Sequence, residues 1–590
     1  MIVPMKKVSI VVQEDDAVSA LEALRSMGIL HVEHAQAPKG KDISLLSEDI
    51  ALLNQVVGIL SGYLPKKKIA HEHRNAGDWK QHARHIVDSQ KRIDQLKEYS
   101  VTLMAQIGQW RPWGDFDPKE IQLLRAKGVV VRFYEILSDE LDKVPPQVAL
   151  KRISARGKTL YCAAFSQGDV EMPFKEIELP KISLAQMQAR LAEDSRAVQL
   201  IREDIARHTR YYRDFLNIKS KFFGDLEFCE ALRGMGEEAG LVYLKGYCPG
   251  ECEAGLLEAA GSNKWGILIE DPVNDDPVPT LIRTPRWVSV IKPLFGLLEI
   301  LPGYHELDVS FMFLIFFSLF FGILIGDAGY GLVYLIAAMF FHRKFKNKIK
   351  DQAPFFLFYV LSSCAIIWGV LTGSYFGQEW CAKLGLKPLI PALNDPRTMQ
   401  TVCFFIGALH LSIAHGWRAV LKSPSVAALA DVGWICVLWS AFFFARLLIL
   451  GEPLPAFVMW LLYSGMACVV LFSDPQKNIL KGIGSGLGTL ALSLMNNFTD
   501  VVSYVRLFAV GMAGLAIAET TNVMSSGLGR DNAVAVIAGM LIIFVGHALN
   551  IILGPMSVLV HGVRLNVLEF SGHAGLGWSG VSYRPLKKDH

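Results

Sequence analysis

An arginine lies inside a long apolar segment near the C-terminal end of the chain. The segment begins at Asn496 and continues to Ala518, and Arg506 is far from both expected helix ends. A cation at the centre of a membrane-spanning helix costs roughly 2.5–3.5 kcal/mol, and such a residue usually faces protein or water on an ion path. Polar residues spaced by 3 or 4 positions share one helix face with it: Asn496, Thr499 and Ser503. The pattern predicts a polar seam that serves ion movement.

A second polar seam follows in the next apolar segment. Its members alternate at spacings of 3 and 4 and would lie on a single helix face: His547, Asn550, Gly554, Ser557, His561 and Arg564. Glu569 follows at the expected cytoplasmic end of this helix. Two arginines that only brace a helix bundle are the alternative explanation, but burying two cations is costly. Two such seams therefore favour an ion-translocating site.

Other polar residues in the apolar part of the chain could serve either an ion path or the local structure. His410, His415 and Arg446 are candidates for an ion path, although a charge at a helix end is cheap. Asp327 lies in the turn Gly326–Gly331 and could line an ion route. The surrounding glycines favour a structural turn at this place.

The elements that must position these residues are membrane-spanning helices. The chain has 590 residues and is 52% hydrophobic, but the part up to about Arg286 is charged and mixed. Beyond Leu301, apolar segments are long enough to cross a bilayer. We expect eight spans: 308–325, 328–342, 354–376, 400–418, 430–450, 455–473, 490–519 and 533–568. The last two exceed the roughly 20 residues that a bilayer needs, so they should be tilted or curved or should project beyond it.

The orientation follows from the ends and loops of the chain. The first residues lack the apolar core and cleavage site of a signal peptide, so the polar half should stay in the cytoplasm. An even number of spans returns the C-terminus to the same side. Basic residues gather at 343–350, 418–422, 477–481 and 584–588, which the positive-inside rule places in the cytoplasm.

The polar half is expected to form two α/β lobes joined by an antiparallel coiled coil. Residues 1–40 and 236–300 would form one lobe, and residues 113–181 the other. The coiled coil would comprise 42–112 and 182–235, with a break at Pro65–Lys68, because both stretches keep heptad-like apolar seams. The cytoplasmic domain would then cover 1–300 and the all-α membrane domain 301–590. Such an arrangement suits bridging better than catalysis.

Several other classes of site are not expected. The net charge of +3 comes without a basic tract, so no nucleic-acid partner is predicted. Gly157-Lys158-Thr159 resembles the end of a phosphate loop, but Arg152 occupies the position of the first glycine. Cys248 and Cys252 lack a second pair nearby. We therefore predict no catalytic residue, no cofactor and no metal site, and solvated helix positions for four histidines: His71, His73, His82 and His85.

Three motifs carry a resemblance to a known family. They are GDAGYG at 326–331, SYVRL at 503–507 and HGVRLNVLEF at 561–570. With them the chain resembles the membrane subunit a, also called subunit I, of rotary V-type ATPases and archaeal-type A/V-ATP synthases. The match is specific in the membrane half and architectural in the polar half.

The resemblance implies roles for the residues of both seams. Arg506 would face a carboxylate of the rotating ring and separate two aqueous half-channels, supported by Arg564, with His561 assisting. The cytoplasmic half-channel would include Asn496, Thr499, Asp500 and Ser503, and candidates for the outer half-channel are His547, Asn550 and Glu519; Glu569 belongs to the same ion-translocating set. This chain departs from the family at Gly554, where some members carry an acidic residue, and at Gly514, where some carry a histidine.

The resemblance also implies partners and a location. They are a proteolipid c/K ring, peripheral stalk subunits of the E/G type, central-stalk or collar subunits and the lipid bilayer, in a prokaryotic plasma membrane. The chain would be a non-catalytic subunit without a nucleotide site of its own. H⁺ and Na⁺ both stay open, as do the pump and synthase directions. The competing hypothesis is a secondary transporter or channel with a cytoplasmic regulatory domain, which would predict inverted repeats and broken helices.

Overall fold

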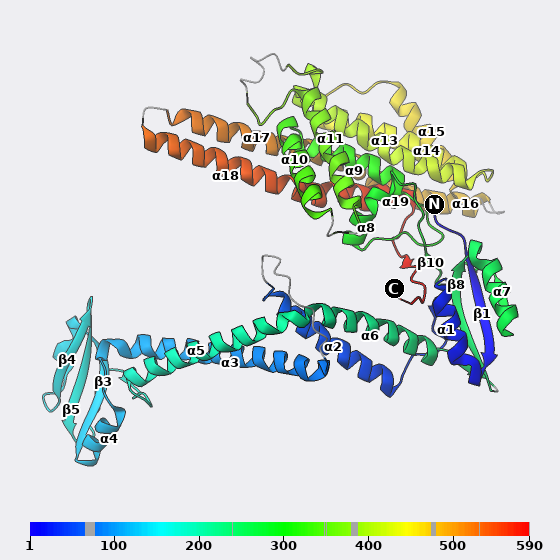
Figure 1. Cartoon of the computed structure of the whole chain (residues 1–590). Coiled ribbons are helices and arrows are strands. Elements are labelled where there is room, and N and C mark those ends of the chain that lie inside the picture. The colour runs from blue at the N-terminus through cyan, green and yellow to red at the C-terminus, as the bar shows by residue number, and fades with distance from the viewer. Residues whose placement is uncertain are drawn as a thin grey trace. The chain divides into compact units, whose positions relative to one another are not determined.

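The computed structural model describes residues 1–64, 77–238, 240–346, 349, 351–378, 387–473, 479–529 and 532–588. The chain divides into two compact units (Figure 1). We call Ile10–Lys245 with Leu586–His590 the N-terminal unit, and Met1–Ser9 with Gly246–Pro585 the C-terminal unit. The domain boundary expected near residue 300 stays a prediction. Some predicted features lie outside the described residues: the helix break at Pro65–Lys68, the histidines His71 and His73, and parts of the basic loops at 343–350 and 477–481.

Long paired helices form the middle of the N-terminal unit. Helix α3 packs against α5, and α2 packs against α6; their bounds are α2 Lys41–Ser61, α3 Trp79–Trp110, α5 Leu184–His208 and α6 Tyr212–Arg233. Helix α5 begins with a capping box, in which Ser183 and Gln186 satisfy each other's backbone N–H groups. The predicted seams supply much of the shared core, including Ile86, Ile93, Ile205 and Phe215. The helices and their pairing agree with the prediction, whereas a supercoiled coiled coil stays a prediction.

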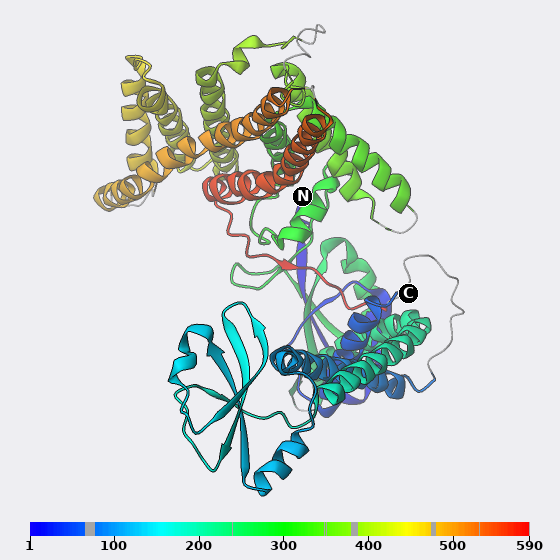
Figure 2. The same ribbon diagram turned by 90° about the vertical axis from the view of Figure 1, so that its left-hand side faces the viewer.

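A small α/β lobe lies at one end of the α3–α5 pair (Figures 1 and 2). Its antiparallel sheet has the order β4-β5-β3-β6, with α4 Pro118–Ala126, β3 Val129–Leu137, β4 Ala149–Arg156, β5 Thr159–Gln167 and β6 Glu176–Ile177. Alternate residues of β3 enter different cores, with Phe133 on one face and Tyr134 on the other. The strands that the alternating pattern predicts at 129–136, 147–153 and 159–165 are present within a few residues.

A second sheet contains the strands near the N-terminus. Its order is β2-β8-β1-β9, with β7 beside β8. The bounds are β1 Met5–Gln13, β2 His31–Glu33, β7 Gly236–Glu238, β8 Leu241–Pro249 and β9 Gly266–Glu270, and the helices nearby in sequence are α1 Ala17–Met27 and α7 Glu253–Asn263. Near the other end of the chain, β10 Pro279–Thr280 pairs in parallel with β11 Val581–Ser582.

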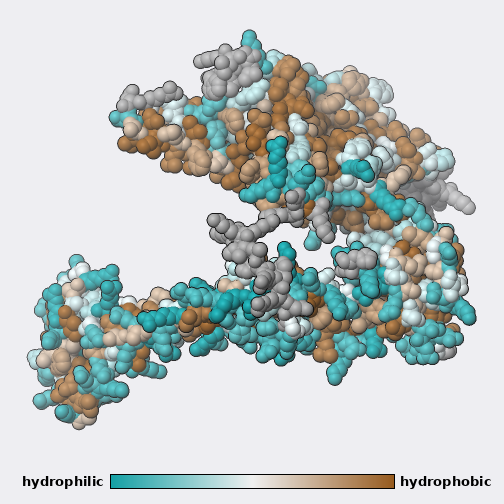
Figure 3. Space-filling model, in the orientation of Figure 1, coloured by the Kyte–Doolittle hydropathy of each residue, from teal (hydrophilic) through white to brown (hydrophobic). Residues whose placement is uncertain are grey.

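Apolar helices make up most of the C-terminal unit. Each of the eight predicted spans overlaps one or more helices: α9 Ser310–Ile325, α10 Ala328–Phe345, α11 Ala353–Thr372, α13 Pro396–Lys422, α14 Ala428–Ala445, α15 Phe457–Phe472, α16 Ile479–Ser503, α17 Val505–Gly527 and α18 Ala533–Ser557. The last span continues beyond α18 into two π-helical segments. Their shared core is rich in phenylalanine, including Phe313, Phe320 and Phe404. Hydrophobic residues also cover much of the outer surface of α17 and α18 (Figure 3).

Length and hydropathy identify six candidate membrane spans among the described residues. They are Lys41–Ser61, Ala353–Thr372, Pro396–Lys422, Ala428–Leu450, Gly486–Gly527 and Ala533–Ala574. All but Lys41–Ser61 fall within the predicted membrane half. Helices α9 and α15 are apolar but shorter than a full span. The structure therefore supports a multi-helix apolar region, and the number of eight crossings stays a prediction.

Helix α11 approaches the start of α10 so closely that only glycine fits at one position. A Cβ atom added at Gly369 would lie 2.0 Å from the backbone nitrogen of Ala328. We expect Gly369→Ala to lower the free energy of unfolding by about 1–3 kcal/mol, because the clash is with backbone and forces the helices apart. Thermal unfolding of the purified protein in detergent measures this effect.

The matched control is Gly416→Ala in α13, where an added Cβ would meet no atom within 4 Å. Alanine favours a helix by up to about 1 kcal/mol over glycine, so the control should unfold at the same or a higher temperature. Equal unfolding midpoints for the two variants would contradict the packing argument.

Candidate functional site

Arg506 lies just after an interruption between two helices. Helix α16 ends at Ser503 and α17 begins at Val505. Between them lies the fully buried Tyr504, whose backbone carbonyl accepts a hydrogen bond from the Leu507 N–H at 3.0 Å. This bond spans three residues and closes a tighter turn than that of an α-helix. The predicted span 490–519 is thus two consecutive helices, and Arg506 belongs to the first turn of α17 and not to the middle of one helix.

The carboxylate of Glu569 lies between the two arginines of the predicted seams. Its Oε1 is 3.8 Å from Nη1 of Arg506 and 3.5 Å from Nε of Arg564. The Glu569 side chain is 6% exposed, whereas those of Arg506 and Arg564 are 23% and 55% exposed. Nη1 of Arg506 has no hydrogen-bond partner among the described residues. Two guanidinium cations share one carboxylate, so the group keeps a net charge of +1, and the buried Nη1 of Arg506 faces Glu569 without a hydrogen bond.

Two π-helical segments bring Arg564 and Glu569 together. They follow α18 at Val558–Gly562 and Leu565–Phe570, shortly after Pro555, which lacks a backbone N–H. Five residues would be rotated by about 140° in an α-helix, but the i→i+5 bonds of a π-helix place them about one turn apart. The α-helical spacing that we used to align His561 and Arg564 with His547 is therefore wrong beyond Ser557.

His561 lies in the first π-helical segment and is partly buried. Arg506 and Arg564 lie near enough to interact electrostatically with its imidazole ring. The structure thus brings four predicted site residues into one neighbourhood: Arg506, His561, Arg564 and Glu569.

A chain of hydrogen-bonded acids and histidines reaches Asp500 from α14. His415 bonds Asp431 through Nδ1 at 3.1 Å and the Nδ1 of His573 through Nε2 at 2.9 Å. Nε2 of His573 is 3.0 Å from Oδ2 of Asp500. We call Asp431, His415, His573 and Asp500 the relay. All four line a cavity of about 380 Å³, together with Asn496 and Asn497.

Basic side chains compensate the buried acid at the far end of the relay. Asp431 is 1% exposed and receives Lys422 Nζ at 2.7 Å and Arg418 Nε at 3.5 Å. Arg418 also donates to the His573 carbonyl oxygen at 2.9 Å. A buried carboxylate is stable only when it is paired in this way.

Two residues of the first predicted seam do not take part in the cavity. The Thr499 hydroxyl donates to the Met495 carbonyl, and the Ser503 hydroxyl donates to the Asp500 carbonyl. Such bonds to the preceding helical turn satisfy a hydroxyl locally. Of the predicted cytoplasmic set, Asn496 and Asp500 therefore line the cavity, and Thr499 and Ser503 do not.

Further cavities lie beyond Arg506 along α17. Glu519 is exposed and lines one of about 380 Å³, together with Gln378 and Asn394. Asn550 lines another of about 340 Å³, and its Nδ2 donates to the Gly514 carbonyl at 2.8 Å.

His547 belongs to a hydrogen-bond network near these cavities. Its Nδ1 lies 2.6 Å from the hydroxyl of Tyr330, and its Nε2 lies 3.1 Å from Oδ1 of Asn522. Tyr330 and Asn522 were not predicted. Tyr330 belongs to the GDAGYG motif, which was interpreted as a turn, and Asn522 follows the end of the predicted span 490–519.

The remaining polar candidates have local structural partners. Asp327 accepts hydrogen bonds from the backbone N–H groups of Gly329 and Tyr330 and from the Ser374 hydroxyl, so it caps α10 as the turn reading expects. Arg446 pairs with Glu452 just beyond α14. His410 bonds the Tyr504 hydroxyl at 2.8 Å and stacks on the rings of Phe316 and Phe570.

Comparison with known proteins gives a consistent family. No family model matches the sequence. The chain is 30% identical to V-type ATP synthase subunit I of Borreliella burgdorferi and 29% identical to V-type ATP synthase subunit I 1 of Treponema pallidum, with 100% of both chains covered in each case. It is 26% identical to A-type ATP synthase subunit I of Methanocaldococcus jannaschii over 61% of this chain and 56% of that one.

Among solved structures, a similar one is the crystal structure of the cytoplasmic N-terminal domain of subunit I, homolog of subunit a, of V-ATPase. It has 12% identity and a TM-score of 0.22, and the match covers 45% of this chain and 99% of that chain. The full-length sequence match at 30% identity is sufficient to assign the family, and the solved structure is not needed for it. The chain belongs to the subunit I family of V-type ATP synthases.

Proposed function

We propose that this subunit is the stationary ion-translocating part of its rotary ATPase, in which Arg506 is an electrostatic gate between two half-channels. The observation that carries the proposal is the state of the Arg506 guanidinium. It is 23% exposed, and the one buried carboxylate near it, that of Glu569, is shared with Arg564, so the group keeps a net positive charge. A permanent, partly exposed cation that its shared carboxylate does not neutralise suits a carboxylate brought by another subunit.

The cavities on either side of Arg506 support the two half-channels. With a rise of 1.5 Å per helical residue, Asp500 lies about 9 Å before Arg506 and Glu519 about 20 Å after it. Between the cavities, Val501 and Tyr504 are fully buried in the apolar core, and the buried Leu507 borders the cavity that contains Glu519. An ion that enters one cavity would therefore need a carrier to reach the other, and a moving carboxylate on a ring of proteolipid subunits can supply it.

The outer surface of α18 supports contact with an apolar partner or lipid. Large apolar side chains are well exposed along it, including Val534, Ile537, Leu541 and Phe544. In our proposal the proteolipid ring and the lipid bilayer cover this surface. The long helices of the N-terminal unit would carry the peripheral stalk and the central-stalk or collar subunits, and both termini would lie in the cytoplasm of a prokaryotic cell.

The relay is the ion path that we propose for the cytoplasmic half-channel. Imidazole and carboxylate groups joined by hydrogen bonds can pass a proton by accepting it on one atom and releasing it from another. We expect His573→Gln to reduce ATP-driven proton uptake into vesicles by at least about tenfold, because glutamine cannot accept and release a proton. Asp500→Asn should have a similar effect.

The matched control for the relay is His342→Gln. His342 also makes a side-chain hydrogen bond, to the Tyr359 hydroxyl at 2.7 Å, but it lies in α10 and outside the relay cavity. Its uptake should equal that of the wild type. Normal uptake by both His573→Gln and Asp500→Asn would remove the relay from the ion path, and loss in Asp500→Asn alone would favour passage of a cation without histidine.

Purification through a tag on this chain tests the function as a whole. The expected preparation contains a proteolipid ring and ATPase subunits, and its vesicles take up ions when ATP is added. Recovery of the chain alone as an active transporter would support a secondary transporter or channel instead.

A further inference from the structure

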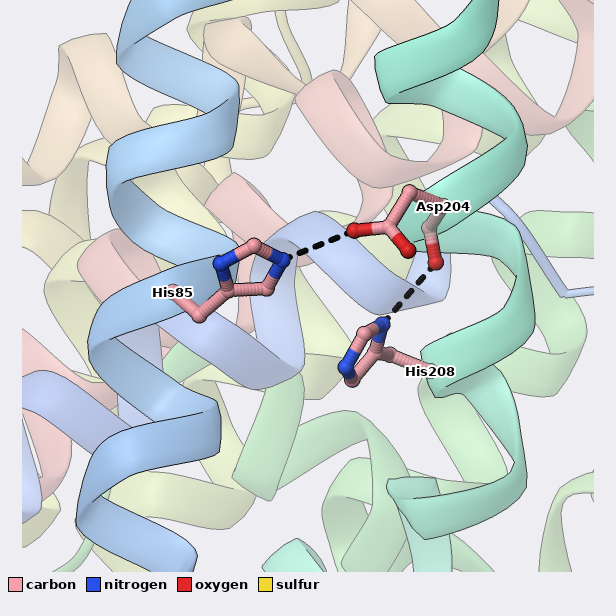
Figure 4. Close-up of side chains that lie close together, drawn as sticks. All are labelled: His85, Asp204 and His208. Carbon is pink, nitrogen blue, oxygen red and sulfur yellow. Dashed lines mark hydrogen bonds and ion pairs between the residues drawn. The ribbon is translucent and has the colours of Figure 1, made fainter.

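Three side chains that could bind a metal ion meet on the paired helices of the N-terminal unit (Figure 4). His85 belongs to α3, and Asp204 and His208 belong to α5. One ligand atom of each lies within 4.8 Å of those of the other two. Nε2 of His85 is 2.7 Å from Oδ2 of Asp204. We call these three residues the helix-pair cluster.

The spacing along each helix explains why these side chains converge. Asp204 and His208 are four residues apart and therefore neighbours on one face of α5. His85 has His82 three residues before it on α3, and the His82 ring centroid is 5.7 Å from that of His208. Each helix thus offers a pair of polar groups to the other, and the packing of α3 against α5 brings the pairs together.

Hydrogen bonds leave suitable atoms available for a metal ion. Nδ1 of His208 lies 2.9 Å from the Asp204 carbonyl oxygen. When Nδ1 donates its proton there, Nε2 is left with a free lone pair, the arrangement typical of histidine ligands.

The charges around the cluster are compatible with a divalent cation. Arg207 is the nearby basic residue, and its Nη2 lies 3.4 Å from Oδ1 of Asp204, which leaves the other oxygen to His85. The side chains of His85 and Asp204 are 53% and 33% exposed, so an ion can reach them from solvent. Ligands about 2.1 Å from a tetrahedral zinc ion are about 3.4 Å apart. The 2.7 Å between Nε2 of His85 and Oδ2 of Asp204 would therefore have to widen, and separations of up to 4.8 Å would have to shorten.

We propose that the helix-pair cluster binds one Zn²⁺-class ion that links α3 to α5. Two imidazoles and one carboxylate form a known ligand set for zinc, with water in the open position. The ion would replace the proton between His85 and Asp204, so acid should weaken its binding. The inference is independent of ion transport and revises our expectation that the chain has no metal site.

Metal binding to the untagged full-length chain tests the proposal. The protein is treated with a chelator in detergent and titrated with Zn²⁺, and with Co²⁺ for its absorption spectrum. We expect one site per chain in the wild type, and an affinity lowered by at least about tenfold in His85→Gln and His208→Gln. Zinc should also raise the unfolding temperature of the wild type and not of these variants.

The controls are a histidine and an aspartate outside the cluster. His305→Gln changes an exposed histidine, and Asp94→Asn changes an exposed carboxylate on the same helix α3. Both should bind zinc like the wild type. Absence of a site in the wild type, or equal affinity in His85→Gln and in both controls, would overturn the proposal. Because His85 is exposed, its variant is expected to fold, so a loss of binding is not a loss of structure.

Discussion

Vesicles that contain the Arg506→Gln complex are expected to show no ATP-driven ion uptake. Two opposite charges about 4 Å apart attract by roughly 4 kcal/mol at an effective dielectric constant of 20, and a nearby cation lowers a carboxyl pKa by about 1–3 units. Glutamine can accept and donate hydrogen bonds but carries no charge. A ring carboxylate that reaches position 506 would then keep its ion, and uptake should fall by at least about 100-fold.

A charge-conserving variant refines this prediction. Arg506→Lys keeps the cation but loses the planar fork, so it cannot contact Glu569 and a second carboxylate in the same geometry. We expect partial uptake from this variant, between that of the wild type and that of Arg506→Gln. The measurement is the initial rate of ion uptake at equal amounts of assembled complex.

Arg446→Gln is the matched control. Arg446 is also a partly buried arginine among the apolar helices, but its partner Glu452 follows six residues later and neither lies in the relay cavity. Uptake by this variant should stay near the wild-type rate. An Arg506→Gln complex that assembles and pumps normally would contradict the electrostatic gate.

Local periodicity was enough to predict most elements of this fold. Alternating residues placed β3 within one residue of its observed bounds at Val129–Leu137, and apolar segments located the helices of the C-terminal unit. These patterns depend on which face of one element is buried, and that information is local. The interruption at Tyr504 could not be predicted in this way, because its backbone stays near helical angles and the apolar pattern continues through it.

The sequence predicts which residues belong to the candidate site better than it predicts which of them are in contact. Arg506, Arg564 and Glu569 were chosen from residue type and position, but their meeting depends on the π-helical segments after Ser557. Apolar periodicity does not distinguish a π-helix from an α-helix over one turn. Pro555 is the single local sign of irregularity in that stretch.

The relay and the helix-pair cluster could not be predicted from the residue pattern of any single helix. His415 and His573 are separated by 158 positions, and they are hydrogen-bonded only because their elements pack together. In the same way, His85 looks like an ordinary solvated residue until the register of α3 against α5 is known. Spacing rules identify which residues share a face, and the tertiary structure decides which faces meet.

Glu569→Gln should destabilise the C-terminal unit more strongly than the exchange of an exposed carboxylate such as Glu519. Removing one partner of a buried ion pair costs about 3–5 kcal/mol, because the remaining charge loses its compensation. Here the change would leave Arg506 and Arg564 facing each other without a carboxylate between them. The half-exposed Arg564 is screened by solvent, so most of the effect should come from Arg506.

A double variant tests whether uncompensated charge is the cause of the expected destabilisation. Arg506→Gln in the Glu569→Gln background removes the less screened of the two uncompensated cations, so the double variant should be more stable than Glu569→Gln alone. Glu519→Gln is the control, because this carboxylate is exposed on α17 and its exchange should change the unfolding midpoint little. Thermal unfolding in detergent measures all four proteins. If Glu569→Gln unfolds at the same temperature as Glu519→Gln, the carboxylate does not hold the two arginines, and Arg506 must be oriented by its apolar neighbours alone.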